Sequence, residues 1–258
     1  MWHWKFSPGD NRNHSELAGI PRPASLDCDF LLRQSRSMSK TYHRTLFLKG
    51  PAGRLEATLW TPARPGPSMT AIVCHPHPLY GGTIHNKVVF RIAKTLHQLG
   101  VPVLRFNFRG AGLSEGTHDE GRGESGDVAA AIDFLSREYY SCPILLAGFS
   151  FGAWVGLRVG CAEPRVSEVI GVGMPVNNSD FSYFQECRKP KLFLQGSRDQ
   201  YGSRESVEAL AATLAEPKRV MFVEGADHFF RGKLDRVDAA LREWMLDQHA
   251  ELRPAAAR

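Results

Sequence analysis

The chain has 258 residues, enough for one large domain with a sizeable core but cramped for two. Its content of 43% hydrophobic and 23% charged residues is ordinary for a globular protein. The net charge of +5 contains no basic run, which argues against a nucleic-acid partner. No segment approaches the roughly 20 apolar residues of a membrane span, and no signal-peptide pattern leads the chain, so we expect no membrane association and a cytoplasmic location.

The two ends of the chain differ in character from the middle. Residues 1–40 are polar and lack a sustained period of 2 or 3.6, so we expect a largely disordered extension. Met38 stands just before the regular pattern, and a true start near it is a fair hypothesis. Residues 249–258 are expected to form a flexible tail. The five cysteines lack metal-site or redox spacing and are expected to be free thiols.

The regular pattern, residues 41–248, alternates short apolar strands with amphipathic helices. The expected strands cover residues 44–48, 54–60, 70–74, 101–106, 144–147, 169–172, 191–194 and 220–223. The expected helices cover residues 87–99, 127–137, 153–161, 203–214 and 233–246. The first two strands form a hairpin over a Gly- and Pro-containing turn. The rest predicts an α/β domain with a mostly parallel, twisted sheet and helices on both faces.

The fifth expected strand runs directly into Gly148-Phe149-Ser150-Phe151-Gly152, and a helix follows. Strand, Gly-x-Ser-x-Gly and helix in succession form the sequence pattern of a nucleophile elbow. The two glycines allow the sharp turn, since a side chain at either position would collide with the neighbouring strand or helix. Ser150 is therefore the candidate nucleophile.

Serine is a poor nucleophile unless a base takes its proton and an acid orients that base. The candidate base is His228, on the loop between the last strand and the last helix. The candidate acid is Asp199, just past another strand end. Asp227 is the rival carboxylate, but adjacent loop residues seldom pair in this way. The order Ser, Asp, His is the order used by α/β hydrolases.

An acyl-transfer site also needs N–H donors for the oxyanion. One is predicted to be the amide of Phe151, the residue after the nucleophile. The second should come from the loop of residues 75–82, where two prolines have no amide hydrogen. His77 is the favoured donor in that loop, and Leu79 and Tyr80 are the alternatives.

The same loop permits a metal interpretation, because His75, His77 and His85 could act as ligands. The prolines restrain the backbone and no carboxylate or thiolate set lies nearby, so we expect no metal site and a structural role for His75. The glycine-rich segment 107–114 lacks the spacing of a nucleotide-binding loop. Its Arg109 is expected to form a structural ion pair.

Substrate-binding residues are harder to identify. Tyr80, Phe181 and Phe229 are candidates for the pocket wall, whereas Trp154 is expected to belong to the core. Too few residues separate the strands at 169–172 and 191–194 for a substantial cap domain. An open site favours small or soluble esters over long-chain lipids.

In combination, several motifs resemble those of compact bacterial α/β-hydrolases of the dienelactone-hydrolase-like and serine-aminopeptidase-like branch. The elbow carries the resemblance together with His75-Pro76-His77-Pro78-Leu79-Tyr80-Gly81-Gly82, Arg105-Phe106-Asn107-Phe108-Arg109-Gly110 and Gly225-Ala226-Asp227-His228-Phe229-Phe230. The resemblance implies an α/β-hydrolase fold with little or no cap, a Ser-Asp-His triad and no cofactor. The chain departs from true dienelactone hydrolases, which use a cysteine nucleophile where Ser150 stands.

The residues and the resemblance together predict a serine hydrolase that cleaves carboxylic esters through an acyl-enzyme. The expected partner is a small-molecule ester substrate. Thioesterase and small-peptide hydrolase activities share the same acyl chemistry and stay open as alternatives. A non-catalytic binding protein on the same fold is the rival from another class.

Overall fold

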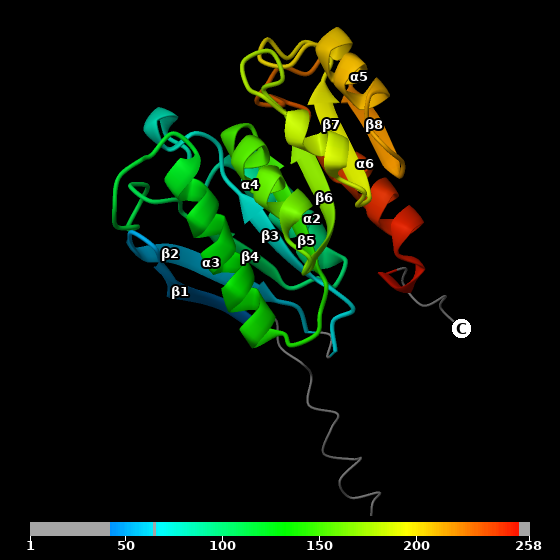
Figure 1. Cartoon of the computed structure of the whole chain (residues 1–258). Coiled ribbons are helices and arrows are strands. Elements are labelled where there is room, and N and C mark those ends of the chain that lie inside the picture. Colours follow the sequence, from blue (N-terminus) through cyan, green and yellow to red (C-terminus); the bar gives the residue numbers. More distant parts are fainter. Residues whose placement is uncertain (1–41, 64–65, 253–258) are drawn as a thin grey trace, which may run out of the picture. The chain divides into compact units, whose positions relative to one another are not determined.

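The computed structural model describes residues 42–63 and 66–252, and their framework is an eight-stranded sheet (Figure 1). The strand order is β1-β2-β4-β3-β5-β6-β7-β8. Their bounds are β1 Tyr42–Gly50, β2 Gly53–Thr61, β3 Thr70–Cys74, β4 Val103–Phe106, β5 Ile144–Phe149, β6 Val166–Val172, β7 Lys191–Gly196 and β8 Lys218–Val223. The β1–β2 and β2–β4 pairs are antiparallel and the other five are parallel, which confirms the predicted sheet.

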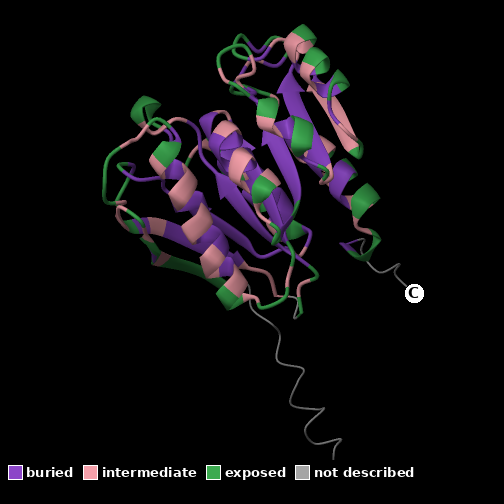
Figure 2. Ribbon diagram, in the orientation of Figure 1, coloured by how far each residue is buried: buried purple, intermediate pink, exposed green. Residues whose placement is uncertain are grey.

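Helices cover both faces of this sheet. Helices α2 (Lys87–Gln98) and α6 (Leu234–Gln248) pack on one face, and their apolar side chains share one core cluster. Helices α3 (Arg122–Glu138), α4 (Phe151–Ala162) and α5 (Arg204–Ala212) pack on the other face around a second cluster. Figure 2 shows the central strands buried between these two layers. Burial on both faces explains why the central strands read as continuous apolar runs.

Helix α3 begins five residues before the predicted position. The cause is Glu124, whose buried carboxylate accepts hydrogen bonds from the amides of Asp119 and Gly121, both at 2.8 Å. These bonds satisfy N–H groups at the start of the helix, which have no intrahelical partner. The polar first turn is therefore helical although it lacks the apolar periodicity on which the prediction rested.

The two ends of the chain lie mostly outside the described residues. The predictions for residues 1–40, including the start near Met38, fall there, as does the tail from residue 253 on. The prediction of a flexible tail is wrong for its first part, residues 249–252. His249 Nε2 lies 2.7 Å from Glu168 Oε1, and a 3₁₀ helix, Ala250–Leu252, places Leu252 in the core. This ion pair and the buried leucine hold residues 249–252 against the domain.

The connection from β6 to β7 contains only a short 3₁₀ helix, Ser182–Glu186, so the described chain has no cap domain, as predicted. None of the described helices has the length and apolar character to span a bilayer.

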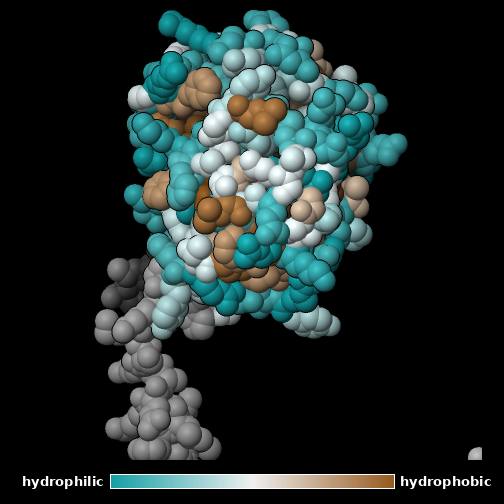
Figure 3. Space-filling model, turned by 90° about the vertical axis from the view of Figure 1, so that its left-hand side faces the viewer, coloured by the Kyte–Doolittle hydropathy of each residue, from teal (hydrophilic) through white to brown (hydrophobic). Residues whose placement is uncertain are grey.

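In Figure 3, hydrophobic residues form separate patches on an otherwise hydrophilic face. The edge strand β1 is largely exposed and carries charged residues such as Arg44 and Lys49, which is typical of edges that avoid further strand pairing.

Candidate active site

The elbow has the geometry that its sequence predicts. Ser150 lies between β5 and α4 with φ 56° and ψ −120°, a conformation that L-residues rarely adopt. A Cβ at Gly148 would lie 2.3 Å from the carbonyl oxygen of Gly152. A Cβ at Gly152 would lie 2.4 Å from the carbonyl oxygen of His75. Only glycine therefore fits at these two positions, and the strained turn presents the Ser150 hydroxyl at the start of α4.

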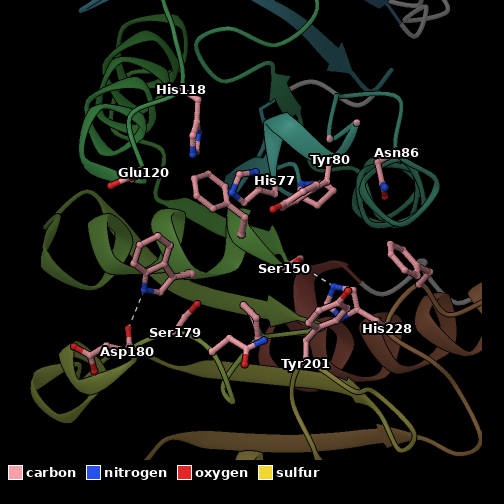
Figure 4. Close-up of a pocket in the computed structure, with 18 residues that line it drawn as sticks. His77, Tyr80, Asn86, His118, Glu120, Ser150, Ser179, Asp180, Tyr201 and His228 are labelled. Atoms are coloured by element: carbon pink, nitrogen blue, oxygen red, sulfur yellow. Dashed lines mark hydrogen bonds between the residues drawn. The ribbon is translucent and has the colours of Figure 1, made fainter.

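Ser150, His228 and Asp199 follow the ends of three separate strands and form one chain of hydrogen bonds. His228, on the loop after β8, places Nε2 3.0 Å from Ser150 Oγ (Figure 4). Its Nδ1 lies 2.8 Å from Asp199 Oδ2, on the loop after β7. A carboxylate can only accept, so Nδ1 carries the proton and Nε2 presents a lone pair to the serine. His228 and Asp199 are both almost fully buried.

The Asp199 carboxylate is fixed by donors other than the histidine. The Tyr201 amide donates to Oδ1 and the Gln195 side-chain amide donates to Oδ2, both at 2.8 Å. Gln195 is fully buried near the end of β7, where it also bonds the backbone of Met174 and Gly202. Sequence reasoning missed Gln195 as a site residue. The available signal was a polar residue directly after the apolar run of residues 192–194, four positions before the acid.

Asp227, the rival carboxylate, has a different environment. Its Oδ1 accepts a hydrogen bond from the Arg231 amide at 3.1 Å, and its Oδ2 lies 3.6 Å from the Arg231 guanidinium. Both contacts are to a residue four positions further along the chain. The structure thus brings Asp199, and not its competitor, to the imidazole of His228.

Two backbone amides near the nucleophile are free to donate. Within the described residues, neither the Phe151 amide nor the His77 amide has a hydrogen-bond partner. The alternatives are occupied, because the Leu79 amide donates to the His77 ring and the Tyr80 amide donates to the His77 carbonyl. The two predicted amides are therefore unpaired within the described residues, and His77 and Phe151 border the same cavity as Ser150.

His75 has a structural environment. Its Nδ1 lies 2.6 Å from the Pro76 carbonyl oxygen, and its Nε2 accepts a hydrogen bond from the Phe108 amide at 2.9 Å. Burial lowers the pKa of His75 to about 4, so the ring is neutral near pH 7. Both ring nitrogens are engaged, which leaves no lone pair for a metal ion. Among the described residues, no group of three or more His, Cys, Asp or Glu side chains could hold one.

Arg109 forms the structural ion pair that its loop predicts. Its guanidinium binds both oxygens of Asp127 on α3, at 2.7 and 3.0 Å, and its amide donates to the same carboxylate. Asp127 is fully buried. This pair ties the loop after β4 to α3.

A cavity of about 570 Å³ opens over Ser150 (Figure 4). Tyr80 and Phe229, two of the three predicted wall residues, border it. The prediction for Phe181 is wrong, because its ring is buried and stacks on Phe184 in the core. Trp154 packs against the core cluster, as expected, but it also borders the cavity one helical turn after the nucleophile, and its indole N–H donates to the Asp180 carbonyl. The full lining consists of Pro76, His77, Tyr80, Gly81, Gly82, Asn86, His118, Glu120, Ser150, Phe151, Trp154, Pro175, Asn178, Ser179, Asp180, Tyr201, His228 and Phe229.

Comparisons with known proteins show which proteins this chain resembles. A family model described as "Alpha/beta hydrolase domain" matches residues 80–251. An uncharacterised protein of Rickettsia prowazekii is 36% identical over 210 residues, which cover 78% of this chain and 88% of that relative. The structure of an alpha-beta serine hydrolase homologue from Coxiella burnetii is 38% identical, with a TM-score of 0.74, and the match covers 78% of this chain and 97% of the other.

A second solved structure shares the open architecture. It is a Xanthomonas campestris protein described as an α/β serine hydrolase without a lid. It is 34% identical, with a TM-score of 0.74, and the match covers 84% of this chain and 98% of the other. The resemblance to compact bacterial α/β-hydrolases is thereby confirmed, and the chain belongs to the α/β hydrolase family.

Proposed function

We propose that this protein is a serine hydrolase that cleaves carboxylic esters of small or soluble substrates through an acyl-enzyme intermediate. The observation that carries the proposal is the unbroken hydrogen-bonded relay from Ser150 through His228 to Asp199, at 3.0 and 2.8 Å. Such a relay supplies both requirements of a serine nucleophile, a base within reach and an acid that orients the base.

In the first half of the reaction, Ser150 Oγ attacks the ester carbonyl carbon while His228 Nε2 takes the hydroxyl proton. The carbonyl oxygen becomes an oxyanion, and we expect the amides of Phe151 and His77, which have no partner within the described residues, to bind it. Asp199 stabilises the imidazolium formed at His228. The tetrahedral intermediate then collapses as His228 gives its proton to the departing alkoxide, which leaves as an alcohol and leaves the acyl group on Ser150.

In the second half, water replaces the alcohol. His228 takes a proton from the attacking water, and a second oxyanion forms at the same two amides. Collapse of this intermediate returns the proton to Ser150 Oγ and releases the carboxylic acid. Each step uses only groups of this chain, the ester and water.

The open cavity supports small or soluble substrates. The described chain has no cap domain over Ser150, and the Xanthomonas campestris relative is likewise described as lacking a lid. Among the described residues, no Leu, Ile, Val or Met side chain borders the cavity, whose apolar walls are aromatic rings such as those of Tyr80, Trp154 and Phe229. A long acyl chain would therefore find few aliphatic contacts there, whereas a short polar ester loses nothing by remaining partly in water.

A substrate panel tests the proposal. Short esters, thioesters and amides of the same acyl group are incubated with the wild type, with Ser150→Ala, and with Ser136→Ala as a matched control on α3. We expect ester hydrolysis that disappears in Ser150→Ala and persists in Ser136→Ala. Faster cleavage of the thioester or amide would assign one of the alternative activities. Hydrolysis of nothing in the panel would favour a binding protein.

A further inference from the structure

Two histidines outside the relay stand side by side at the cavity. The ring centroids of His77 and His118 lie 4.6 Å apart, and both residues border the cavity. Figure 4 shows the two imidazoles next to each other on the side of the cavity where Tyr80 lies, across from Ser179 and Asp180. The side chain of His118 is only 9% exposed. The proposed hydrolysis uses the backbone amide of His77 but neither of these rings.

The proton position on His118 follows from its neighbour. Its Nδ1 lies 2.9 Å from Oε1 of Glu124, whose side chain is fully buried. The N–H is not aligned for a regular hydrogen bond, but two lone pairs at this distance would repel each other, so Nδ1 carries the proton. Glu124 itself is held by the amides of Asp119 and Gly121. The second nitrogen, Nε2, is then a hydrogen-bond acceptor in the neutral ring.

The opposite arrangement holds for His77. Its Nδ1 accepts a hydrogen bond from the Leu79 amide at 3.3 Å, so in the neutral ring the proton sits on Nε2. Partial burial is the largest influence on the pKa of His77 and lowers it, which favours the neutral form, while the Glu124 carboxylate acts in the opposite direction. Neither Nε2 atom has a hydrogen-bond partner within the described chain. The pair therefore offers one donor and one acceptor next to each other.

A hydroxyl group matches this pair, because it donates one hydrogen bond and accepts others. The remainder of the cavity suits the same chemistry: Asn86, Asn178 and Ser179 add polar groups, and the described lining contains the acidic residues Glu120 and Asp180 but no lysine or arginine that would select an anion. We infer that His77 and His118 bind a substrate hydroxyl, and that the substrates are hydroxylated esters. The inference rests on the proposed function and names its substrate class.

Matched pairs of esters test the inference. Glycerol monoacetate and propyl acetate differ only by hydroxyls on the alcohol side. Ethyl 3-hydroxybutyrate and ethyl butyrate differ only by a hydroxyl on the acyl side. Two hydrogen bonds in a partly open site are expected to favour the hydroxylated member of one pair by about tenfold or more in kcat/KM. The pair that shows the preference identifies the side of the ester that carries the hydroxyl.

Three substitutions of His118 separate recognition from folding. His118→Phe removes both nitrogens and is expected to abolish the preference. His118→Asn keeps a polar group near the position of Nδ1, against Glu124, and is also expected to abolish it. His118→Gln places an amide near the position of Nε2 and is expected to retain part of it. Tyr140→Ala, an exposed aromatic residue just after α3, is the control and should leave the preference unchanged.

Three results would overturn the inference: no preference in either pair, a preference that survives His118→Phe, or equal loss in the Asn and Gln variants. A different set of results would contradict the proposed function. If propyl acetate and ethyl butyrate are cleaved by the wild type and not by Ser150→Ala, the hydrolase stands whatever the hydroxyl preference. If neither ester pair is cleaved, the hydrolase proposal itself is contradicted.

Discussion

Replacement of Asp199 by asparagine tests the orientation of the base. All three neighbours of the carboxylate are donors: His228 Nδ1 and Gln195 Nε2 point at Oδ2, and the Tyr201 amide points at Oδ1. An asparagine side chain has one acceptor oxygen and one NH₂ group. If its oxygen faces Tyr201, its NH₂ meets the imidazole, and His228 must move its proton to Nε2. The nitrogen facing Ser150 then no longer has a lone pair.

The expected loss of turnover in Asp199→Asn can be estimated from this geometry. A histidine held in the wrong tautomer cannot take the serine proton, and in the analogous serine protease substitution the turnover falls by about 10⁴. That factor corresponds to about 5 kcal/mol of transition-state stabilisation. We therefore expect Asp199→Asn to lower kcat for a short ester by a comparable factor. The donor–donor contact that remains at Gln195 should also lower the thermal stability.

The assay compares kcat and melting temperature for the wild type, Asp199→Asn and Asp227→Asn. The second variant is the matched control, because within the described residues the Asp227 carboxylate pairs with Arg231 and not with His228, so this variant should keep near-normal kcat. A folded Asp199→Asn protein with near-normal turnover would refute the reasoning. A large loss in Asp227→Asn alone would mean that the other carboxylate orients the base.

Two further substitutions probe the supports of the site, and a third probes the ion pair that holds residues 249–252 against the domain. Gly152→Ala places a methyl group 2.4 Å from a backbone oxygen, so we expect a protein that folds poorly, measured by circular dichroism; a native melting curve would contradict this. Gln195→Leu removes one donor from Asp199, and we expect kcat to fall about tenfold with little change in KM, since a hydrogen bond to a charged group contributes about 1.5–3 kcal/mol; an unchanged kcat would contradict the assignment. The hydrogen bond to Glu168 raises the pKa of His249, so its stabilising contribution is fully present below pH ~6.5 and is lost as pH rises through the raised value. His249→Ala should therefore lower the melting temperature more at pH 6 than at pH 9, and an equal effect at both would contradict it.

The parts of the site that depend on local chain geometry could be predicted from the sequence. Gly148, Ser150 and Gly152 lie within one turn, and the steric demands of that turn appear directly in the residue types. Asp199 and His228 are far apart in sequence, but the carboxyl ends of parallel strands meet at one edge of a sheet. The predicted alternation of strands and helices was therefore enough to bring these two residues to the serine.

The parts that depend on packing between distant segments could not be predicted. Phe181 and Trp154 are both aromatic, and only the tertiary structure shows that the first stacks in the core while the second borders the cavity. His118 had no signal of its own, since its importance comes from Glu124 behind it and His77 beside it. Burial and partners of this kind arise from the folded structure and leave no periodic trace in the sequence.

The most direct test is intact-mass spectrometry after treatment with a fluorophosphonate probe, followed by peptide mapping. A serine activated by His228 displaces fluoride from the probe, and we expect one adduct per chain, located on Ser150. The adduct should be absent in Ser150→Ala and form far more slowly in His228→Ala. Absence of labelling in a folded wild-type protein, or an adduct on another serine, would contradict the proposed nucleophile.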